Sequence, residues 1–495
     1  MKHVWACVLV ITATVSPAAA QSSPGTESVE QRLTRLEQLV STLQTQVGEL
    51  RATRSSSAPA TANADRDVPA QARRGGSDAG QRDVRTGPLS WNGEFRLYFD
   101  SLRRPASSES APLANTRGRY LFALGMQTAL APTVDLRARL STGPANNPLT
   151  DIQDFGGGAS KHPISIDEAF IDVHPGSNRV RLQAGRVDNP FNDRSRFVYD
   201  TDTRFNGATE VAGRSRNGLG FSRLQVLAGQ YILTNPNVPV IAAGSPSTAS
   251  NATASQALLA TGLSAGQAAP SSALFQQGVV LEHRRSTNTM QRLTVDLTLI
   301  RQPNQLQLMS EPGGLFLVST STGLTPSSAL PSLGNGTTTP GGGQFTASGF
   351  HIAHVGYLLE QRRFSVAGRT LPLTVDTQFA RNLKAAFAND ALMASVSLGD
   401  ASPRRARVAY AFFRKEANSL LGQLTENDIA VSSSVNMAGH FARVEFGLAR
   451  NIVAAANVSL NTFLADSDPE RHFYVPFGRG TPRQRRVQFL LTTRF

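Results

Sequence analysis

Hydrophobic and polar residues alternate along most of the chain after residue 90, and the C-terminus shows this pattern clearly. The last eleven residues, RRVQFLLTTRF, place Val487, Phe489 and Leu491 on one parity and Arg486 on the other. A period of two is that of a β-strand, whose successive side chains point to opposite faces. The sequence therefore predicts a terminal strand with one apolar face, which ends on the aromatic Phe495.

The same alternation recurs in sixteen segments. It predicts strands at 91–101, 118–130, 134–143, 165–174, 179–187, 205–213, 218–233, 275–285, 291–302, 349–360, 370–382, 390–399, 404–416, 438–449, 453–465 and 485–495. No helical pattern interrupts this series, so the region 87–495 is predicted to be all-β.

The links between these predicted strands alternate between short and long. After every second strand the link is short, as at 131–133 and 286–290, whereas most other links are long, as at 234–274 and 303–348. Short turns at one end and long loops at the other are typical of an outer-membrane β-barrel. About eleven residues at roughly 3.3 Å, tilted by about 45°, span the apolar band of about 25 Å. We therefore expect a sixteen-stranded antiparallel transmembrane β-barrel over 87–495.

A periplasmic β-sandwich or a surface lectin would have the same period, but with its apolar residues packed inside. The second parity is rich in Arg, Asp, Gln and small residues, and the strands continue over more than about 400 residues without a helical layer. These features favour the barrel, in which the apolar parity faces lipid.

The N-terminus predicts export. Residues 1–20, MKHVWACVLVITATVSPAAA, combine Lys2, an apolar stretch and a final Ala-Ala-Ala, which is the pattern of a secretory signal peptide. Cys7 precedes the apolar stretch, which does not fit a lipoprotein signal. Because Cys7 is the only cysteine, the processed chain is expected to contain no disulfide and no zinc–thiolate site.

A short coiled coil and a linker are predicted to follow. The apolar positions in 21–51 are spaced alternately by four and three residues, at Val29, Leu33, Leu36, Val40, Leu43, Val47 and Leu50. This heptad pattern predicts a periplasmic helix that associates with copies of itself, with a slight preference for a dimer. Residues 52–86 are rich in Ala, Ser, Gly, Arg and Asp and are predicted to be a flexible linker.

The chain carries a formal net charge of +13, almost all of it from arginine. The arginines are scattered singly, and the protein is predicted to be exported, so we expect no nucleic-acid partner. Charged groups on a lipid face cost about 2–4 kcal/mol each near the midplane. The pore-lining arginines are therefore predicted to be Arg96, Arg119, Arg137, Arg139, Arg179, Arg181 and Arg443.

Rings of arginine favour the entry of anions. Acidic neighbours such as Glu94, Asp100, Asp135 and Glu445 would offset part of that field. The sequence thus allows a pore with a modest anion preference, or a nearly neutral pore whose arginines and acids create a transverse field.

Residues 139–208 contain Ile166-Asp167, Ala169, Asp172, Pro175, Gly185-Arg186, Asn189-Pro190-Phe191 and Tyr199-Asp200-Thr201-Asp202. In these features the stretch resembles the putative porin family of Gram-negative outer membranes. The segments LPLTVDTQFARN and VAYAFFRKEANSLLGQLTENDIA also look like this family, so that the resemblance covers about 90–230 and 345–495. The phosphate-selective porins are more distantly similar. Glu426-Asn427-Asp428 replaces the Asp-Ser-Asp that is usual in the family.

This resemblance implies a trimeric, water-filled channel for passive diffusion of small solutes. It also implies that Phe495 is part of the signal recognised by the outer-membrane assembly machinery. In sixteen-stranded porins the loop after the fifth strand folds inward, so Arg194, Arg196, Asp200 and Asp202 of loop 187–204 are predicted to line a constriction. The alternative is that this loop is external.

No catalytic or cofactor-binding pattern stands out. His351 and His354 are three residues apart, which places them on opposite faces of a strand, and Gly156–Lys161 lacks the spacing of a phosphate-binding loop. We therefore expect an outer-membrane porin that is not an enzyme and has no metal or cofactor. The alternatives are a plugged barrel that acts as a surface adhesin or anchor, and an outer-membrane hydrolase.

Overall fold

The computed structural model describes most of the predicted barrel region. The described residues are 89–106, 112–143, 149–155, 162–175, 179–189, 197–215, 220–233, 272–303, 317–320, 323–326, 335, 348–426, 434–464 and 483–495. The predicted signal peptide 1–20, coiled coil 21–51 and linker 52–86 lie outside these residues.

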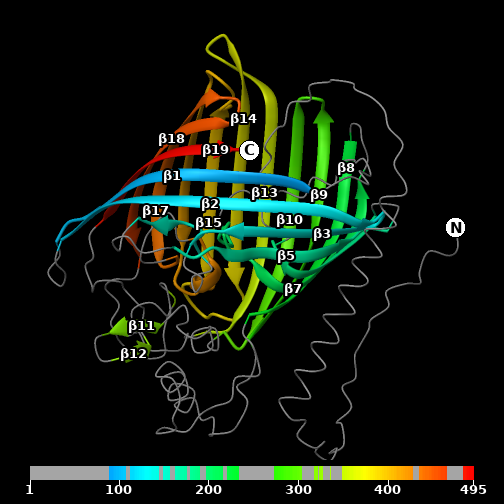
Figure 1. Ribbon diagram of the computed structural model, residues 1–495, viewed down its shortest axis with the longest axis horizontal. Coiled ribbons are helices and arrows are strands. Elements are labelled where there is room, and N and C mark those ends of the chain that lie inside the picture. Colours follow the sequence, from blue (N-terminus) through cyan, green and yellow to red (C-terminus); the bar gives the residue numbers. More distant parts are fainter. Residues whose placement is uncertain are drawn as a thin grey trace, which may run out of the picture. The chain divides into compact units, whose positions relative to one another are not determined.

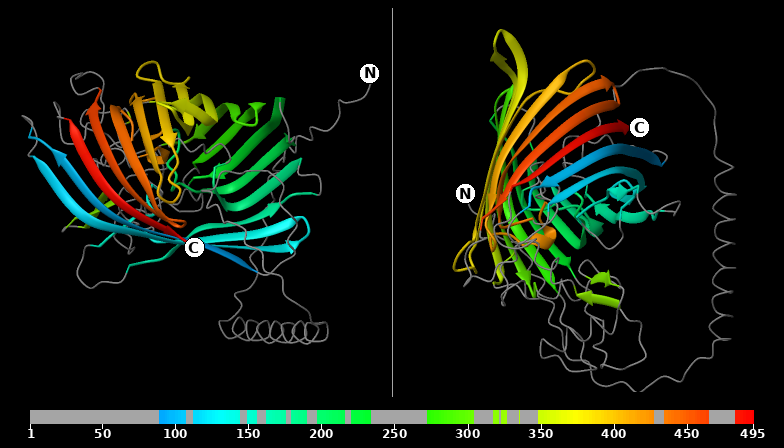
Figure 2. Two further views of the ribbon diagram at one scale, coloured as in Figure 1. Left: turned by 90° about the horizontal axis from the view of Figure 1, so that it is seen from above. Right: turned by 90° about the vertical axis from the view of Figure 1, so that its left-hand side faces the viewer.

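Sixteen strands form a closed antiparallel β-barrel (Figures 1 and 2). The strands are β1 (Ser90–Arg104), β2 (Leu113–Ala131), β3 (Val134–Ser141), β5 (Ser165–Val173), β6 (Val180–Val187), β7 (Phe205–Ser215), β8 (Gly220–Ile232), β9 (Ala273–Ser286), β10 (Thr289–Arg301), β13 (Phe350–Val366), β14 (Arg369–Asn382), β15 (Asp390–Gly399), β16 (Ala406–Lys415), β17 (Met437–Ala449), β18 (Ile452–Phe463) and β19 (Gln484–Arg494). Each predicted strand is present, so this part of the sequence prediction is confirmed.

The barrel closes because β1 pairs with β2 on one side and with β19 on the other. In the β1–β19 pair, Phe99 lies opposite Phe489 and Asp100 lies opposite Gln488. At the end of this seam the backbone N–H of Gly93 donates to the carbonyl oxygen of Phe495 at 2.8 Å. The terminal strand is thus built into the wall.

Four small elements in the links were not predicted. β4 (Gln153–Asp154) pairs with β2, and β11 (Leu317–Thr320) and β12 (Gly323–Pro326) form a separate hairpin. A 3-10 helix, η1, covers Gly422–Leu424. Within the described ranges, no helix is long and apolar enough to cross a membrane.

The burial pattern is the reverse of that in a soluble β-sandwich. On the seam, Phe99 and Phe489 are 51% and 55% exposed, whereas Asp100 and Gln488 are 1% and 6% exposed. The same parity rule holds on β8, where Val226 is exposed and Gln225 is buried. Apolar side chains therefore cover the outer surface of the barrel, and polar side chains face inward.

The end of the barrel that carries the long loops is an exception, because it holds an apolar cluster inside. Inward-facing residues from the ends of β5 to β17 form this inner apolar cluster, among them Phe170, Val187, Phe205, Tyr231, Leu274, Ile300, Phe350, Phe413 and Met437. Phe197, Tyr199, Leu420, Leu421 and Leu424 from two links pack into it. The inner wall is thus polar along its length and apolar where the loops fold onto it.

Candidate functional site

Part of the loop after β6 lies inside the barrel. Phe197 is 1% exposed, and Tyr199 Oη lies 3.1 Å from Thr298 Oγ1 on β10. The backbone N–H of Asp200 donates to the carbonyl oxygen of Leu424 at 2.9 Å. Arg194 and Arg196, which were predicted to line a constriction here, lie outside the described residues.

The second inward segment, 417–426, was not predicted as part of the site. The side chain of Asn335 makes three hydrogen bonds to this segment. Its Nδ2 donates to the carbonyl oxygens of Ala417 and Leu420, both at 2.7 Å, and its Oδ1 accepts from the N–H of Gly422 at 2.8 Å. Thr425 Oγ1 then donates to the carbonyl oxygen of Val198 at 3.1 Å. Three leucines in SLLGQL within a link between strands were the sequence signal that could have revealed this packing.

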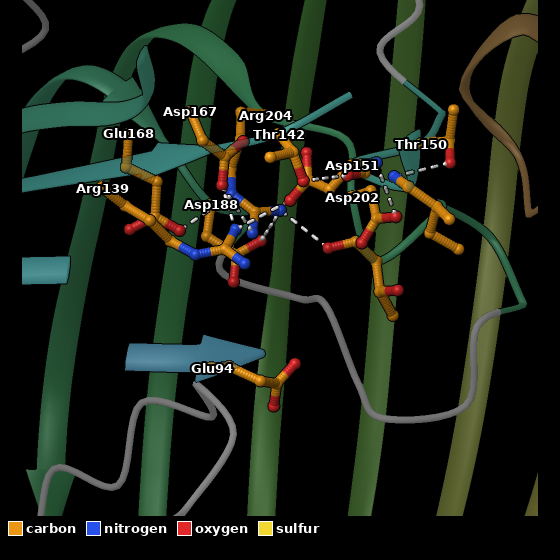
Figure 3. Close-up of polar contacts among 12 residues, drawn as sticks. Glu94, Arg139, Thr142, Thr150, Asp151, Asp167, Glu168, Asp188, Asp202 and Arg204 are labelled. Carbon is orange, nitrogen blue, oxygen red and sulfur yellow. Dashed lines mark hydrogen bonds and ion pairs between the residues drawn. The ribbon is translucent and has the colours of Figure 1, made fainter. Parts of the chain in front are cut away.

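A cluster of charges lies where β3, β5 and the loop ends meet (Figure 3). Arg204 Nε donates to Glu168 Oε1 at 2.8 Å, and its Nη2 lies 3.4 Å from Asp167 Oδ2. Arg139 also pairs with Asp167, and its Nη1 lies 3.1 Å from Asp151 Oδ2. Arg204 was missed in the sequence analysis, although it closes the acidic segment DTDTR.

Asp151 and Asp202 meet in this cluster. The backbone N–H of Asp151 donates to Asp202 Oδ2 at 3.1 Å. Burial and the nearby charges of Asp202 and Asp167 raise the pKa of Asp151 to about 7, although Arg139 and Arg204 oppose this shift. Asp151 therefore changes charge near neutral pH.

The predicted arginines of β1 and β2 are buried in ion pairs. Arg96 pairs with Glu94, which also accepts from Arg494 at 2.9 Å. Arg119 Nε lies 2.5 Å from Asp154 Oδ1. On the same wall, Asp100 is 1% exposed and accepts two hydrogen bonds of 2.8 Å from Arg486. Each of these arginines thus has a carboxylate partner, although the four arginines share only three carboxylates.

The other predicted arginines lie at three separate places. Arg181 and Arg137 share the buried Asp172, with Arg181 Nε at 2.7 Å and Arg137 Nη2 at 3.5 Å from its carboxylate. Arg443 Nη2 lies 2.7 Å from Glu445 Oε1. Arg179 is exposed beside the short turn before β6 and lies outside these clusters.

A closed barrel with apolar side chains outside and paired charges inside is typical of an outer-membrane β-barrel protein. Residues 100–260 match a family model described as "Putative porin". No curated protein matches the sequence.

Solved porin structures are similar at low identity. Salmonella typhi OmpF in complex with daunomycin is 10% identical and covers 82% of this chain and 97% of its own, with a TM-score of 0.40. Pseudomonas putida OprB at high pH is 10% identical, with coverage of 82% and 94% and a TM-score of 0.46. A Rhodopseudomonas blastica porin triple mutant is 11% identical, with coverage of 82% and 100% and a TM-score of 0.39.

Proposed function

We propose that the protein forms a water-filled channel in the outer membrane through which small solutes diffuse passively. The observation that carries this proposal is the reversed burial pattern, in which Phe99 and Phe489 face outward while Asp100 and Gln488 face inward. Lipid covers an apolar outer surface favourably, and a polar inner wall suits water and hydrophilic solutes. The fold and the family match also favour a non-enzymatic channel.

The ion pairs of the inner wall support weak rather than strong charge selectivity. Most of the predicted pore-lining arginines, including Arg96, Arg119 and Arg139, lie next to carboxylates. Electrostatic stabilisation of an anion is reduced where a carboxylate already neutralises the guanidinium. We expect a modest preference for anions, superimposed on a field between the arginines and the acidic loop residues.

The family resemblance extends this proposal to assembly and location. We propose a homotrimer with the predicted N-terminal helix in the periplasm, and we propose that Phe495 serves in recognition by the assembly machinery. The pairing of Phe495 with Gly93 supports a terminal residue that also closes the wall. Asp200 and Asp202 remain the described candidates for the constriction.

One observation favours a second function. Phe197, Tyr199 and the leucines of 417–426 pack inside the barrel mouth, which would suit a plugged barrel that acts as a surface adhesin or anchor.

Single-channel recording in planar bilayers separates the two functions. An open porin should give discrete ohmic steps, with a reversal potential shifted slightly towards that of the anion under a salt gradient. A correctly folded protein that inserts but stays silent would contradict the porin and support the plugged barrel.

A further inference from the structure

A chain of buried polar side chains crosses the inner wall from the loop after β6 to β13. Asn189 Nδ2 donates to Gln276 Oε1 on β9 at 2.7 Å, and Gln276 Nε2 donates to Asp296 Oδ1 on β10 at 3.1 Å. Asp296 Oδ2 in turn lies 2.6 Å from Nδ1 of His354 on β13. The start of the loop is thus connected to three strands of the wall.

The surroundings of His354 favour a doubly protonated ring. Its Nε2 lies 3.0 Å from Oε1 of Gln378 on β14. Gln378 is oriented by its own Nε2, which donates to Asp376 at 3.2 Å, so its oxygen must face the histidine. Both ring nitrogens therefore face oxygen acceptors, and only an imidazolium, with two N–H groups, can donate to both. The carboxylate of Asp296 compensates the charge.

The same histidine contacts the inward loop. The ring of Phe197 lies 6.3 Å from the ring of His354, and Lys415 Nζ lies 5.6 Å from the centroid of Phe197. Two residues further on, Tyr199 bonds to Thr298, which is on the same strand as Asp296. The described part of the loop therefore packs beside His354 and bonds to β10, the strand that carries Asp296.

We infer that His354 is a positioning residue for the inward loop: its doubly protonated ring, held between Asp296 and Gln378, keeps Phe197 and the segment 197–204 seated inside the barrel. This inference rests on the proposed channel function, because the seated loop would set the width of the solute path. When the ring loses a proton, one nitrogen faces an oxygen with no hydrogen between them. The ring then shifts, and the loop loosens.

Other charged groups surround this site. Asp296 lies on β10, Asp376 on β14 and Lys415 on β16, and the charge of Lys415 interacts with those of Glu426 and Asp200. Each could add its own pH dependence to the loop. The experiment must therefore separate His354 from its neighbours by substitution.

The loop position can be measured with a single introduced cysteine, because Cys7 is the only natural cysteine and lies in the predicted signal peptide. We propose Val198→Cys, which is partly buried on the seated loop, with thiol labelling rates at pH 6 and pH 9 normalised to the denatured protein at each pH. Labelling should be slow at pH 6 and about tenfold faster at pH 9, which corresponds to the loss of one charge-assisted hydrogen bond. His354→Gln should label fast at both pH values.

His351→Gln is the matched control, because this residue lies on the same strand and faces the other side. This variant should keep the wild-type change in labelling rate between pH 6 and pH 9. An unchanged profile in His354→Gln, or an equal loss in both variants, would overturn the inference.

A second measurement does not depend on any variant folding. The ¹⁵N shifts of the His354 ring in the wild-type protein at pH 7 should show two protonated nitrogens, and a neutral ring would refute the inference. Bilayer recordings on the same samples separate the two proposals. If the protein conducts no current but its labelling rate changes with pH as expected, the channel proposal is wrong and the role of His354 stands. If the protein conducts but its labelling rate does not change with pH, the role of His354 is wrong and the channel proposal stands.

Discussion

At the scale of single residues, the inner wall is organised by carboxylates that each serve more than one arginine. Asp167 pairs with Arg139 and Arg204, and Asp172 pairs with Arg137 and Arg181. Such sharing orients the long arginine side chains and reduces their net field. Removal of one arginine should therefore expose a carboxylate rather than simply delete a positive charge.

Replacement of Arg139 by Gln tests this point. Asp151 and Asp167 would lose a cationic partner, so the cation-to-anion permeability ratio should rise roughly twofold. Reversal potentials under a salt gradient measure the ratio. The parallel variant Arg137→Gln should act in the same direction, and unchanged potentials in both would show that neither residue faces the solute path.

The raised pKa of Asp151 predicts that the ion selectivity of the channel changes with pH near neutrality. Its pKa is raised to about 7, so the carboxyl is neutral when the loops pack at low pH. Because the pKa of Asp151 is higher in the folded protein than in the unfolded chain, protonation of this carboxyl stabilises the folded protein. The stabilisation is complete below about pH 4 and is lost as the pH rises through about 7. Between pH 5 and pH 8.5 the reversal potential should move towards that of the cation.

Asp151→Asn should abolish this shift. Asp400→Asn, in the short link at the opposite end of the barrel, serves as the control and should leave the shift intact. If Asp151→Asn keeps the wild-type pH profile, another group is responsible for it.

At the scale of elements, the barrel depends on contacts between segments that are distant in sequence. Asn335 joins the link before β13 to the segment 417–426, more than 80 residues away. Gly93 and Phe495 join the first and last strands, and a Cβ atom on Gly93 would lie 2.3 Å from the Phe495 ring. Each of these two contacts can be tested by one substitution, with barrel stability or single-channel current as the readout.

Gly93→Val should weaken the seam between β1 and β19. The new side chain must displace the ring of Phe495. That ring is 62% exposed and can move, so we expect a loss at the lower end of the range of about 1–3 kcal/mol for overpacking. Urea titration of the folded barrel in lipid vesicles measures the loss. Gly356→Ala is the matched control, because its nearest neighbour would be an ordinary contact at 3.5 Å, and a similar loss in both variants would contradict the explanation.

Asn335→Ala should loosen the inward segment 417–426. Three hydrogen bonds of a fully buried side chain would be lost, which leaves buried backbone groups unpaired at a cost of about 1–3 kcal/mol. We expect noisier single-channel currents. Asn335→Asp keeps an acceptor for Gly422 but places a carboxylate oxygen against the carbonyl oxygens of Ala417 and Leu420. It should therefore be at least as disruptive as Asn335→Ala, and a wild-type current in either variant would count against the anchor.

At the scale of the whole molecule, the decisive property is which parity faces lipid. Val226 and Gln225 are neighbours on β8 that face opposite ways. Val226→Arg should destabilise the barrel in vesicles by about 2–4 kcal/mol, because the charge must enter the bilayer. Gln225→Arg should be tolerated far better, and equal costs would contradict the assigned orientation.

The fold could be predicted from the sequence because its signals are local. Alternation along β8 or β19 and the length of each link are visible in short windows, and they define the strands, the orientation and the closure. The charge cluster depends instead on the register between β3 and β5, which brings Arg139 to Asp167, and on the path of the loop that carries Arg204. The seating of Leu420 and Leu421 inside the mouth likewise depends on tertiary contacts.

The pairing of β1 with β19 has a consequence for biogenesis. Glu94 on β1 and Arg494 on β19 are separated by about 400 residues. The pairing of these two strands removes both free sheet edges, and it has the largest entropic cost of loop closure among the strand pairs described. Hairpins of neighbouring strands can form early, while closure must come late and slowly. Until then two long strand edges offer unpaired amides to any other chain, so we expect folding in isolation to compete with edge-to-edge aggregation.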